Sequence, residues 1–444
     1  MHTEALLGEG SGVFRTALPS GIRVITETMP GLSSETVGVW VDSGSRDETP
    51  ETAGSTHFLE HMLFKGTHRH SSKDIARIFD LLGGDSNAVT AKDYTCYFAR
   101  CILDDLPQAT DLLWDMVLDA LLDAGEFERE RGVIIEELAM AADDPLDVLF
   151  ETADQVFYSD QPLGRPVGAT RERIRDLGHG ELLEHYRHAY VGPRLVFAAA
   201  GGAGHEQIVD LVLRATAHLP AVAGTEVPAG GAVTGWAAGR ANGTGARPAR
   251  ATSVFTPGVQ LLGKDLEQQQ LLLGFEGVSE LGEDRFASTV LQSLLGGGMS
   301  SRLFQSVREE HGLAYSVYCT GARYPDVGDF GIYAGCAPEK AQQVLDLCQA
   351  EFERLAALGP SAAEVVDVAA QASAATVLGM ESTAVRMNRL ARSELTGQRL
   401  RSAEWIVDAV RSVTGAQVRE LAARMLAGPR ALVAIGPRTD LHLP

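Results

Sequence analysis

The order of strands and helices repeats in the two halves of this chain, and this repeat limits the possible folds more than any other feature. In the first half a hydrophobic strand at 34–43 precedes a helix near 53–65, a strand pair and a long helix at 126–142. In the second half the strand EQQQLLLGFEGV precedes a helix near 286–296, another strand pair and a long helix at 361–378. Each half also has a late hydrophobic strand, RLVFAAAG or RALVAIG. The repeat predicts two homologous α+β domains, each with a mixed or antiparallel sheet and packed helices.

A segment of different composition separates the halves. Residues 219–253 are rich in Gly, Ala, Pro and Thr and lack hydrophobic periodicity, which is typical of a linker. We therefore predict a first domain at 1–218, a linker at 219–254 and a second domain at 255–444.

Charge and cysteine content exclude several classes of protein. The formal net charge is −21, which argues against a nucleic-acid partner because such a partner needs a basic patch. The five cysteines are odd in number and form no C-x-x-C pair, so a disulfide framework is not expected and a reducing compartment fits. Residues 1–21 lack the pattern of a signal peptide, and no window approaches the roughly 20 apolar residues of a membrane span. We expect a cytoplasmic protein with no membrane partner.

The stretch STHFLEHMLFKGT, residues 55–67, carries the pattern H-x-x-E-H. On a helix His57 and His61 share one face, so both imidazoles can bind one metal ion. Glu60, beside His61, can take a proton from water at that ion without being a ligand. Ser55 and Thr56 can cap the start of the helix. The alternative is an ordinary amphipathic helix that happens to carry two histidines.

A catalytic zinc site usually has three protein ligands, so one ligand is missing from this stretch. The carboxylate-rich helical segment GEFERERGVIIEELAMAADDP offers candidates. Glu130 and Glu137 are two turns apart and share a face, whereas Glu136 is rotated by about 100°. The spacing alone does not choose between Glu136 and Glu137.

HFLEHMLFKGT followed by ERERGVIIEEL closely resembles the inverzincins, zinc peptidases with an inverted H-x-x-E-H motif. This family includes pitrilysin, insulin-degrading enzyme and the mitochondrial processing peptidase. The resemblance extends through GRPVGATRERIRDL and HYRHAYVGPRLVFAAAGG, and it is closest to the processing peptidase β subunit and its bacterial relatives. It implies a zinc metalloendopeptidase, with one Zn²⁺ per chain, that hydrolyses short or unfolded peptides.

The resemblance also implies roles for residues of the first half. His57, His61 and Glu137 would bind zinc, and Glu60 would be the general base. Glu130 matches a glutamate that supports the site without binding the metal. Asn87 and Ala88 match positions on an edge strand to which an extended peptide adds.

In the second half, Arg308 and Tyr315 match a substrate-contacting pair. Arg308 would hold a substrate carbonyl, and Tyr315 would stabilise the tetrahedral oxyanion. Asp147 and Glu151 match acidic residues that recognise an arginine near the cleavage point; a solvated acidic helix face is the alternative for these two.

The long members of the family join two such pairs of domains into a closed chamber, so this chain resembles half of a clamshell. Because it carries both the zinc motif and the Arg308–Tyr315 pair, we expect a homodimer in which each active site is shared between chains. Peptide substrates, basic ones included, are the expected partners. The alternative functions are a non-catalytic scaffold related to respiratory core subunits and a maturation protease dedicated to one peptide.

Overall fold

The computed structural model describes residues 1–8, 10–219 and 250–444. It divides into two compact units that are discontinuous in sequence. Most of the predicted linker, 220–249, lies outside the described residues. The predicted domains were contiguous, whereas the units consist of the following segments: Met1–Leu138, Val167–Ala251 and Gly379–Ser402 in the first, and Ala139–Pro166, Thr252–Leu378 and Ala403–Pro444 in the second.

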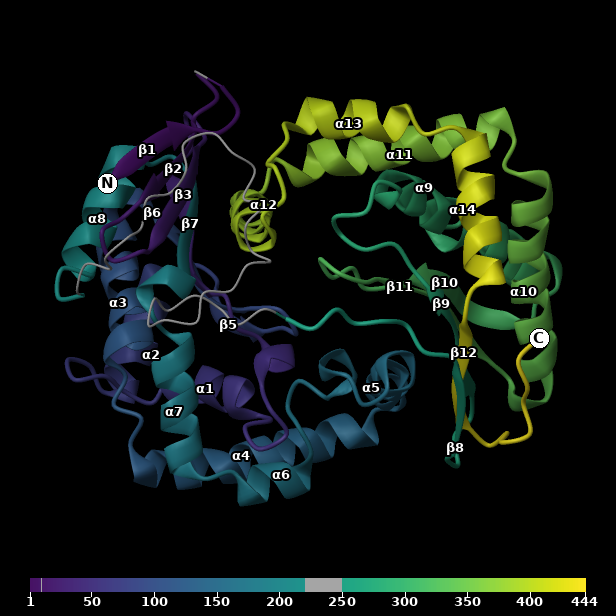
Figure 1. The fold of residues 1–444 in the computed structure, drawn as a ribbon, viewed down its shortest axis with the longest axis horizontal. Coiled ribbons are helices and arrows are strands. Elements are labelled where there is room, and N and C mark those ends of the chain that lie inside the picture. Colours follow the sequence, from purple (N-terminus) through teal and green to yellow (C-terminus); the bar gives the residue numbers. More distant parts are fainter. Residues whose placement is uncertain (9, 220–249) are drawn as a thin grey trace. The chain divides into compact units, whose positions relative to one another are not determined.

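The first unit contains a mixed sheet in the order β1-β2-β3-β7-β4-β6-β5. Several of its strands are labelled in Figure 1. Strands β3 and β7 pair in parallel, and the other neighbours pair antiparallel. Among the described strands, β5 pairs only with β6 and so forms one edge of the sheet. The strands are β1 (His2–Ala5), β2 (Val13–Ala17), β3 (Arg23–Thr28), β4 (Ser34–Val41), β5 (Ser86–Thr90), β6 (Thr95–Ile102) and β7 (Leu195–Gly201).

The second unit repeats this sheet without its first two strands. Its order is β10-β11-β9-β12-β8, in which only β8 and β12 pair in parallel. The order and directions match β5-β6-β4-β7-β3 of the first unit, so the predicted duplication is present in the sheets. The strands are β8 (Gly258–Gly263), β9 (Gln269–Glu276), β10 (Ala314–Thr320), β11 (Asp329–Cys336) and β12 (Arg430–Gly436).

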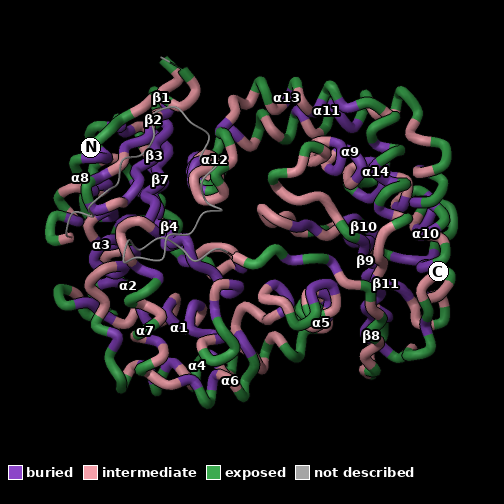
Figure 2. Tube along the Cα trace, viewed as in Figure 1, coloured by how far each residue is buried: buried purple, intermediate pink, exposed green. Residues whose placement is uncertain are grey.

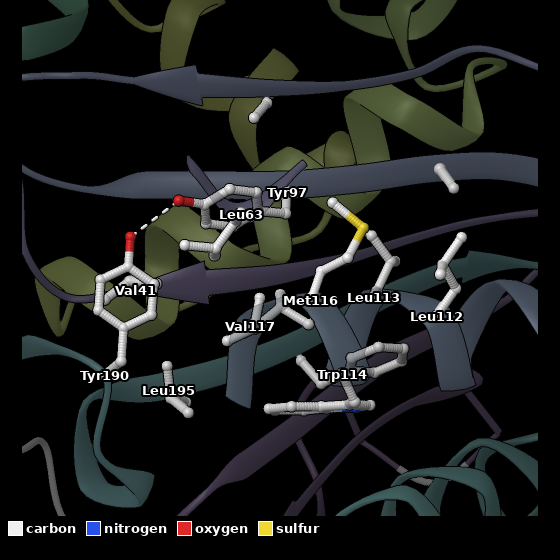
Figure 3. Close-up of a cluster of buried hydrophobic side chains, with 14 of the residues drawn as sticks. Val41, Leu63, Tyr97, Leu112, Leu113, Trp114, Met116, Val117, Tyr190 and Leu195 are labelled. Carbon is white, nitrogen blue, oxygen red and sulfur yellow. Dashed lines mark hydrogen bonds between the residues drawn. The ribbon is translucent and has the colours of Figure 1, made fainter. Parts of the chain in front are cut away.

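Helices cover one face of the first sheet and bury the main core of that unit. Alternate residues of β7 point to opposite faces, and Leu195 and Phe197 pack with Trp114 of α3 in this core. Figure 3 shows part of it, where the hydroxyl groups of Tyr97 and Tyr190 hydrogen bond at 2.8 Å. The helices that supply this layer are α1 (Ser55–Leu63), α2 (Ser72–Leu82), α3 (Leu106–Asp119), α4 (Ala124–Asp143), α6 (Arg171–Asp176), α7 (His179–Ala189) and α8 (His205–Ala215).

The second sheet has a corresponding helical layer and core. Leu273 and Phe275 of β9 and Leu432 of β12 point into it, while Leu272 and Val433 point to the opposite face. Figure 2 shows the central strands of both sheets as buried and the outer helix faces as exposed. The helices of this unit are α5 (Pro145–Tyr158), α9 (Arg285–Gly296), α10 (Ala341–Leu358), α11 (Ala362–Gly379), α13 (Ala403–Arg411) and α14 (Gly415–Ala427).

The opposite face of each sheet is covered by a helix from the other half of the chain. On the first sheet Met387 and Leu390 of α12 (Thr383–Thr396) pack against Val196 and Ala198 of β7. On the second sheet Leu149 of α5 belongs to the apolar cluster of that face. This exchange of α5 and α12 is why the compact units are not continuous segments.

None of the helices in the described part of the chain is long and apolar enough to cross a membrane.

Candidate metal centre

The helix α1 begins at Ser55, and its N-cap residue is Gly54, whose φ of +89° is in the left-handed region. Glycine suits this position because the left-handed conformation is strained for other residues. The predicted caps, Ser55 and Thr56, lie inside the helix. The first turn is instead satisfied by the buried carboxylate of Glu48, which accepts hydrogen bonds from the amides of Gly54 at 2.9 Å and Thr56 at 2.6 Å.

One face of α1 packs against α4. The ring of Phe58 stacks on Phe127 of α4, with centroids 4.4 Å apart and planes at 24°, and both rings are fully buried. Stacked aromatic side chains of this size hold two helices in a definite register. The neighbouring side of α1, which carries the two histidines, is thereby placed beside Glu130 and Glu137 of α4.

The described part of the chain contains one group of potential metal ligands, which consists of His57, His61 and Glu137. One ligand atom from each lies within 4.8 Å of the others. The Glu137 Oε2 atom is 3.8 Å from His57 Nε2 and 3.4 Å from His61 Nε2. Glu136 is exposed and does not belong to this group, so the packing distinguishes two neighbours that the spacing did not.

The imidazole of His57 favours its neutral form. Burial, and next the nearby His61, hold the pKa of His57 below its usual value. Its Nδ1 is buried and has no hydrogen-bond partner among the residues that the structure describes. A Cβ atom at Gly168 would lie 3.4 Å from this Nδ1 and only 2.9 Å from Leu138 Cδ2, so a residue without a side chain fits beside the ring.

Glu130 orients the ring of His61 through a hydrogen bond with Nδ1. Its Oε2 is 3.1 Å from His61 Nδ1, and because a carboxylate can only accept, Nδ1 carries the hydrogen. His61 Nε2 then has a free lone pair on the side of Glu137. The other oxygen of Glu130, Oε1, forms an ion pair with Lys65 Nζ at 2.6 Å.

Glu60 lies on the same helix and is bound to the edge strand. The hydroxyl of Thr90, the last residue of β5, donates a hydrogen bond to Glu60 Oε2. On the same strand Ala88 is buried, while Asn87 is exposed and accepts a hydrogen bond from the Ala88 amide at 2.9 Å. The predicted base and the predicted peptide-binding strand are therefore adjacent.

Arg308 and Tyr315 contact one another in the second unit. Arg308 lies in a π-helix, Phe304–Glu310, and Tyr315 is near the start of the edge strand β10. The guanidinium carbon is 4.8 Å from the centre of the Tyr315 ring and 4.7 Å from that of Phe304. Since Tyr315 remains 74% exposed, the pair can contact a ligand.

Asp147 and Glu151 lie one turn apart on α5, and both are exposed. Gln155 donates to Glu151 at 3.4 Å. The two carboxylates belong to the second unit, with Arg308 and Tyr315, whereas the histidine cluster belongs to the first.

Three residues at the site were not identified from the sequence: Glu48, Lys65 and Thr90. Lys65 continues the four-residue spacing of His57 and His61, and Thr90 shares a strand face with Ala88, so both had a local signal. The contact of Glu48 with the start of α1 depends on the loop fold and had none.

The side chains present fit a zinc ion. Two imidazole nitrogens and one carboxylate are ligands that zinc prefers, and three protein ligands are typical of a catalytic site. The neutral state favoured for His57 and the hydrogen bond that directs His61 Nε2 toward Glu137 both suit metal binding.

Two repeated α+β units, of which one carries this cluster on an inverted H-x-x-E-H helix, define an inverzincin-type peptidase. Family comparisons agree. Residues 23–171 match Insulinase (Peptidase family M16), and residues 176–372 match the Peptidase M16 inactive domain. The chain belongs to peptidase family M16. The absence of H-x-x-E-H from the second half is consistent with the description of the second match.

Curated relatives cover nearly the whole chain. An uncharacterized zinc protease of Streptomyces coelicolor is 41% identical over 96% of this chain and 90% of its own length. A second, from Bacillus subtilis, is 34% identical over 96% and 99%. Homologues named in this way support a zinc-dependent peptidase.

Solved structures share the fold at low identity. A protease from Helicobacter pylori superimposes with a TM-score of 0.84 at 20% identity, over 95% of this chain and 98% of that one. A peptidase M16 inactive domain from Pseudomonas fluorescens gives 0.83 at 19% identity, over 97% and 99%. These likenesses support the predicted two-domain α+β fold.

Proposed function

We propose that this protein is a zinc metalloendopeptidase that hydrolyses short or unfolded peptides in the manner of a processing peptidase. The observation that carries the proposal is the convergence of His57 Nε2, His61 Nε2 and the Glu137 carboxylate beside Glu60. When bound, zinc would supply a Lewis acid that activates water and polarises the scissile carbonyl.

Residues of the chain would carry out the proton transfers and bind the substrate. Glu60 takes a proton from the attacking water and transfers it to the leaving amine. The open edge of β5 at Asn87 and Ala88 accepts the peptide as an added strand through main-chain hydrogen bonds. Arg308 holds a substrate carbonyl, and the Tyr315 hydroxyl donates a hydrogen bond to the developing oxyanion.

A digest of a peptide library tests this proposal, with the wild-type protein, the wild type in chelator and Glu60→Gln. We expect cleavage by the wild type alone, and activity should return when zinc is restored. A wild type that shows no chelator-sensitive cleavage would favour the scaffold alternative. Cleavage limited to one sequence would instead favour a dedicated maturation protease.

We also propose a homodimer with shared active sites, because one chain carries both the zinc motif and the Arg308–Tyr315 pair. In this proposal each zinc centre is completed by the pair from the other subunit. Mixing Glu60→Gln chains with Tyr315→Phe chains should then restore activity, because one of the two sites in the mixed dimer has both intact residues. If activity does not recover after subunit exchange, the two functional halves act within one chain.

Asp147 and Glu151 are proposed to select basic peptides. Two exposed carboxylates one turn apart on α5 can bind a guanidinium group in bidentate fashion. The double variant Asp147→Asn, Glu151→Gln should lose kcat/KM for peptides with arginine near the cleaved bond. Peptides that have leucine there should be cleaved as before, and an equal loss for both would contradict the assignment.

A further inference from the structure

Lys65 contacts Glu130, the carboxylate that holds His61, although the proposed reaction gives Lys65 no role. It follows the C-cap residue Phe64 of α1, and its amide donates to the carbonyl of Met62 at 3.0 Å. This last turn keeps Lys65 on the side of the helix that carries His57 and His61. Its Nζ lies 2.6 Å from Oε1 of Glu130.

The Glu130 carboxylate uses each oxygen for a different partner. Oε1 binds Lys65, and Oε2 accepts the Nδ1 hydrogen of His61 at 3.1 Å. Because this carboxylate is only 7% exposed, water has little access to replace a lost partner, and a buried charge needs ion pairs or hydrogen bonds. The Lys65 ammonium therefore restrains the rotation of Glu130.

We propose that Lys65 is a positioning residue for metal binding, which holds Glu130 so that His61 presents Nε2 beside Glu137. The inference deepens the proposed zinc site and rests on it. Hydrogen-bonded partners behind a metal-binding histidine fix its orientation, and their loss typically costs roughly 10–100-fold in metal affinity. Lys65 acts one step farther out, through Glu130.

The direction in which zinc affinity changes when Lys65 is replaced distinguishes a positioning role from a purely electrostatic one. A cation near the site repels a second cation, so removing the Lys65 charge would strengthen zinc binding if electrostatics alone acted. If Lys65 positions Glu130, its removal weakens zinc binding. The two mechanisms thus predict opposite changes in the dissociation constant.

The test measures the zinc dissociation constant by competition with a chromogenic chelator, with zinc alone as the probe. For Lys65→Met we expect binding about tenfold weaker than wild type. Lys65→Arg keeps a cation that can reach Glu130 and should stay within about threefold. Lys73→Met makes the same change at an exposed position of α2 and should have no effect. Unchanged or tighter binding by Lys65→Met would overturn the proposal.

A second pair of variants tests whether Lys65 acts through Glu130. In a Glu130→Gln background, Lys65→Met should leave the zinc dissociation constant unchanged, because the partner carboxylate is gone. A further loss in that background would sink the inference. This comparison also serves if Lys65→Met alone fails to fold because it leaves the Glu130 charge buried. If Glu137→Gln binds zinc as tightly as wild type, the metal site itself is refuted, which is a separate outcome.

Discussion

Thr90 donates its hydroxyl hydrogen to Glu60 and so connects the edge strand β5 to the helix α1. One oxygen of the carboxylate is held by this bond, which leaves the other for water. The expected peptide-binding strand and the expected general base are thereby held in one geometry. If a peptide adds to β5 as proposed, this contact fixes the position of Glu60 relative to that peptide.

The first prediction concerns this bond. Replacing Thr90 by Val removes the hydroxyl while it preserves the shape of the side chain, so the Glu60 carboxylate loses a fixed orientation. We expect kcat to fall about tenfold, since a hydrogen bond to a charged group contributes roughly 1.5 kcal/mol or more. KM and zinc content should change little, and Thr90→Ser should retain most activity. A change confined to KM would place the role of Thr90 in substrate binding.

The chemistry of α1 could be predicted from the sequence because His57, Glu60 and His61 lie within one turn and a helix alone determines their relation. The choice between Glu136 and Glu137 depended on the rotation of α4 against α1, which the Phe58–Phe127 contact sets. The family resemblance indicated Glu137 where the spacing could not. Lys65 and Thr90 had a local signal in their spacing, but the partners that reveal their roles, Glu130 and Glu60, lie on other elements.

The exchange of α5 and α12 could not be predicted from local patterns. Periodicity identifies a segment as an amphipathic helix, but many sheets can bury the same apolar stripe. Which sheet α12 covers is determined by contacts such as Met387 against Val196 and Ala198, far apart in the sequence. The repeat of strand order was readable because it depends only on the succession of elements.

The second prediction uses the neighbouring glutamates as a matched pair. Glu137→Gln removes the carboxylate beside both imidazoles and should weaken zinc binding by at least about 100-fold, more than the loss of an outer partner. Glu136→Gln makes the same chemical change one residue away and should remain within threefold of wild type, or about 0.65 kcal/mol. Zinc titration against a competing chelator measures both. Similar losses in the two variants would contradict the assignment of Glu137.

The third prediction concerns Glu35 of β4, which is buried and accepts a hydrogen bond from the Ala203 amide at 2.8 Å. Burial raises the pKa of Glu35 to about 8. Because the folded state holds this proton more tightly, its stabilising contribution is complete below the unfolded pKa of roughly 4.5 and is lost as the pH rises toward 8. Glu35→Gln cannot titrate. As the pH rises from 5 to 8, the free energy of unfolding of wild type should therefore fall relative to that of Glu35→Gln by an amount on the order of 1–3 kcal/mol.

Denaturant unfolding of both proteins in chelator checks this, because titration of the empty metal site cancels in the difference. Parallel pH dependences would contradict the assignment of the buried proton to Glu35.

The last prediction concerns how α12 is held on the first sheet. Glu394 of α12 accepts from Arg15 Nη2 of β2 at 2.9 Å and from Arg23 Nη1 of β3 at 3.4 Å, and its side chain is only 12% exposed. Replacing this carboxylate removes an ion-pair partner of two largely buried arginines, and breaking a buried ion pair typically costs roughly 3–5 kcal/mol. Glu394→Gln should therefore lower the free energy of unfolding of the first unit by about 3 kcal/mol.

Glu126→Gln is the matched control for Glu394→Gln. It removes one partner of the ion pair with Arg129 on the surface of α4, where water replaces the lost contact, so no measurable change in stability is expected. Thermal unfolding followed by fluorescence, with hydrogen exchange of α12 amides, measures both effects. If Glu394→Gln melts like wild type and α12 exchanges no faster, apolar packing against β7 holds the helix and the ion pairs contribute little.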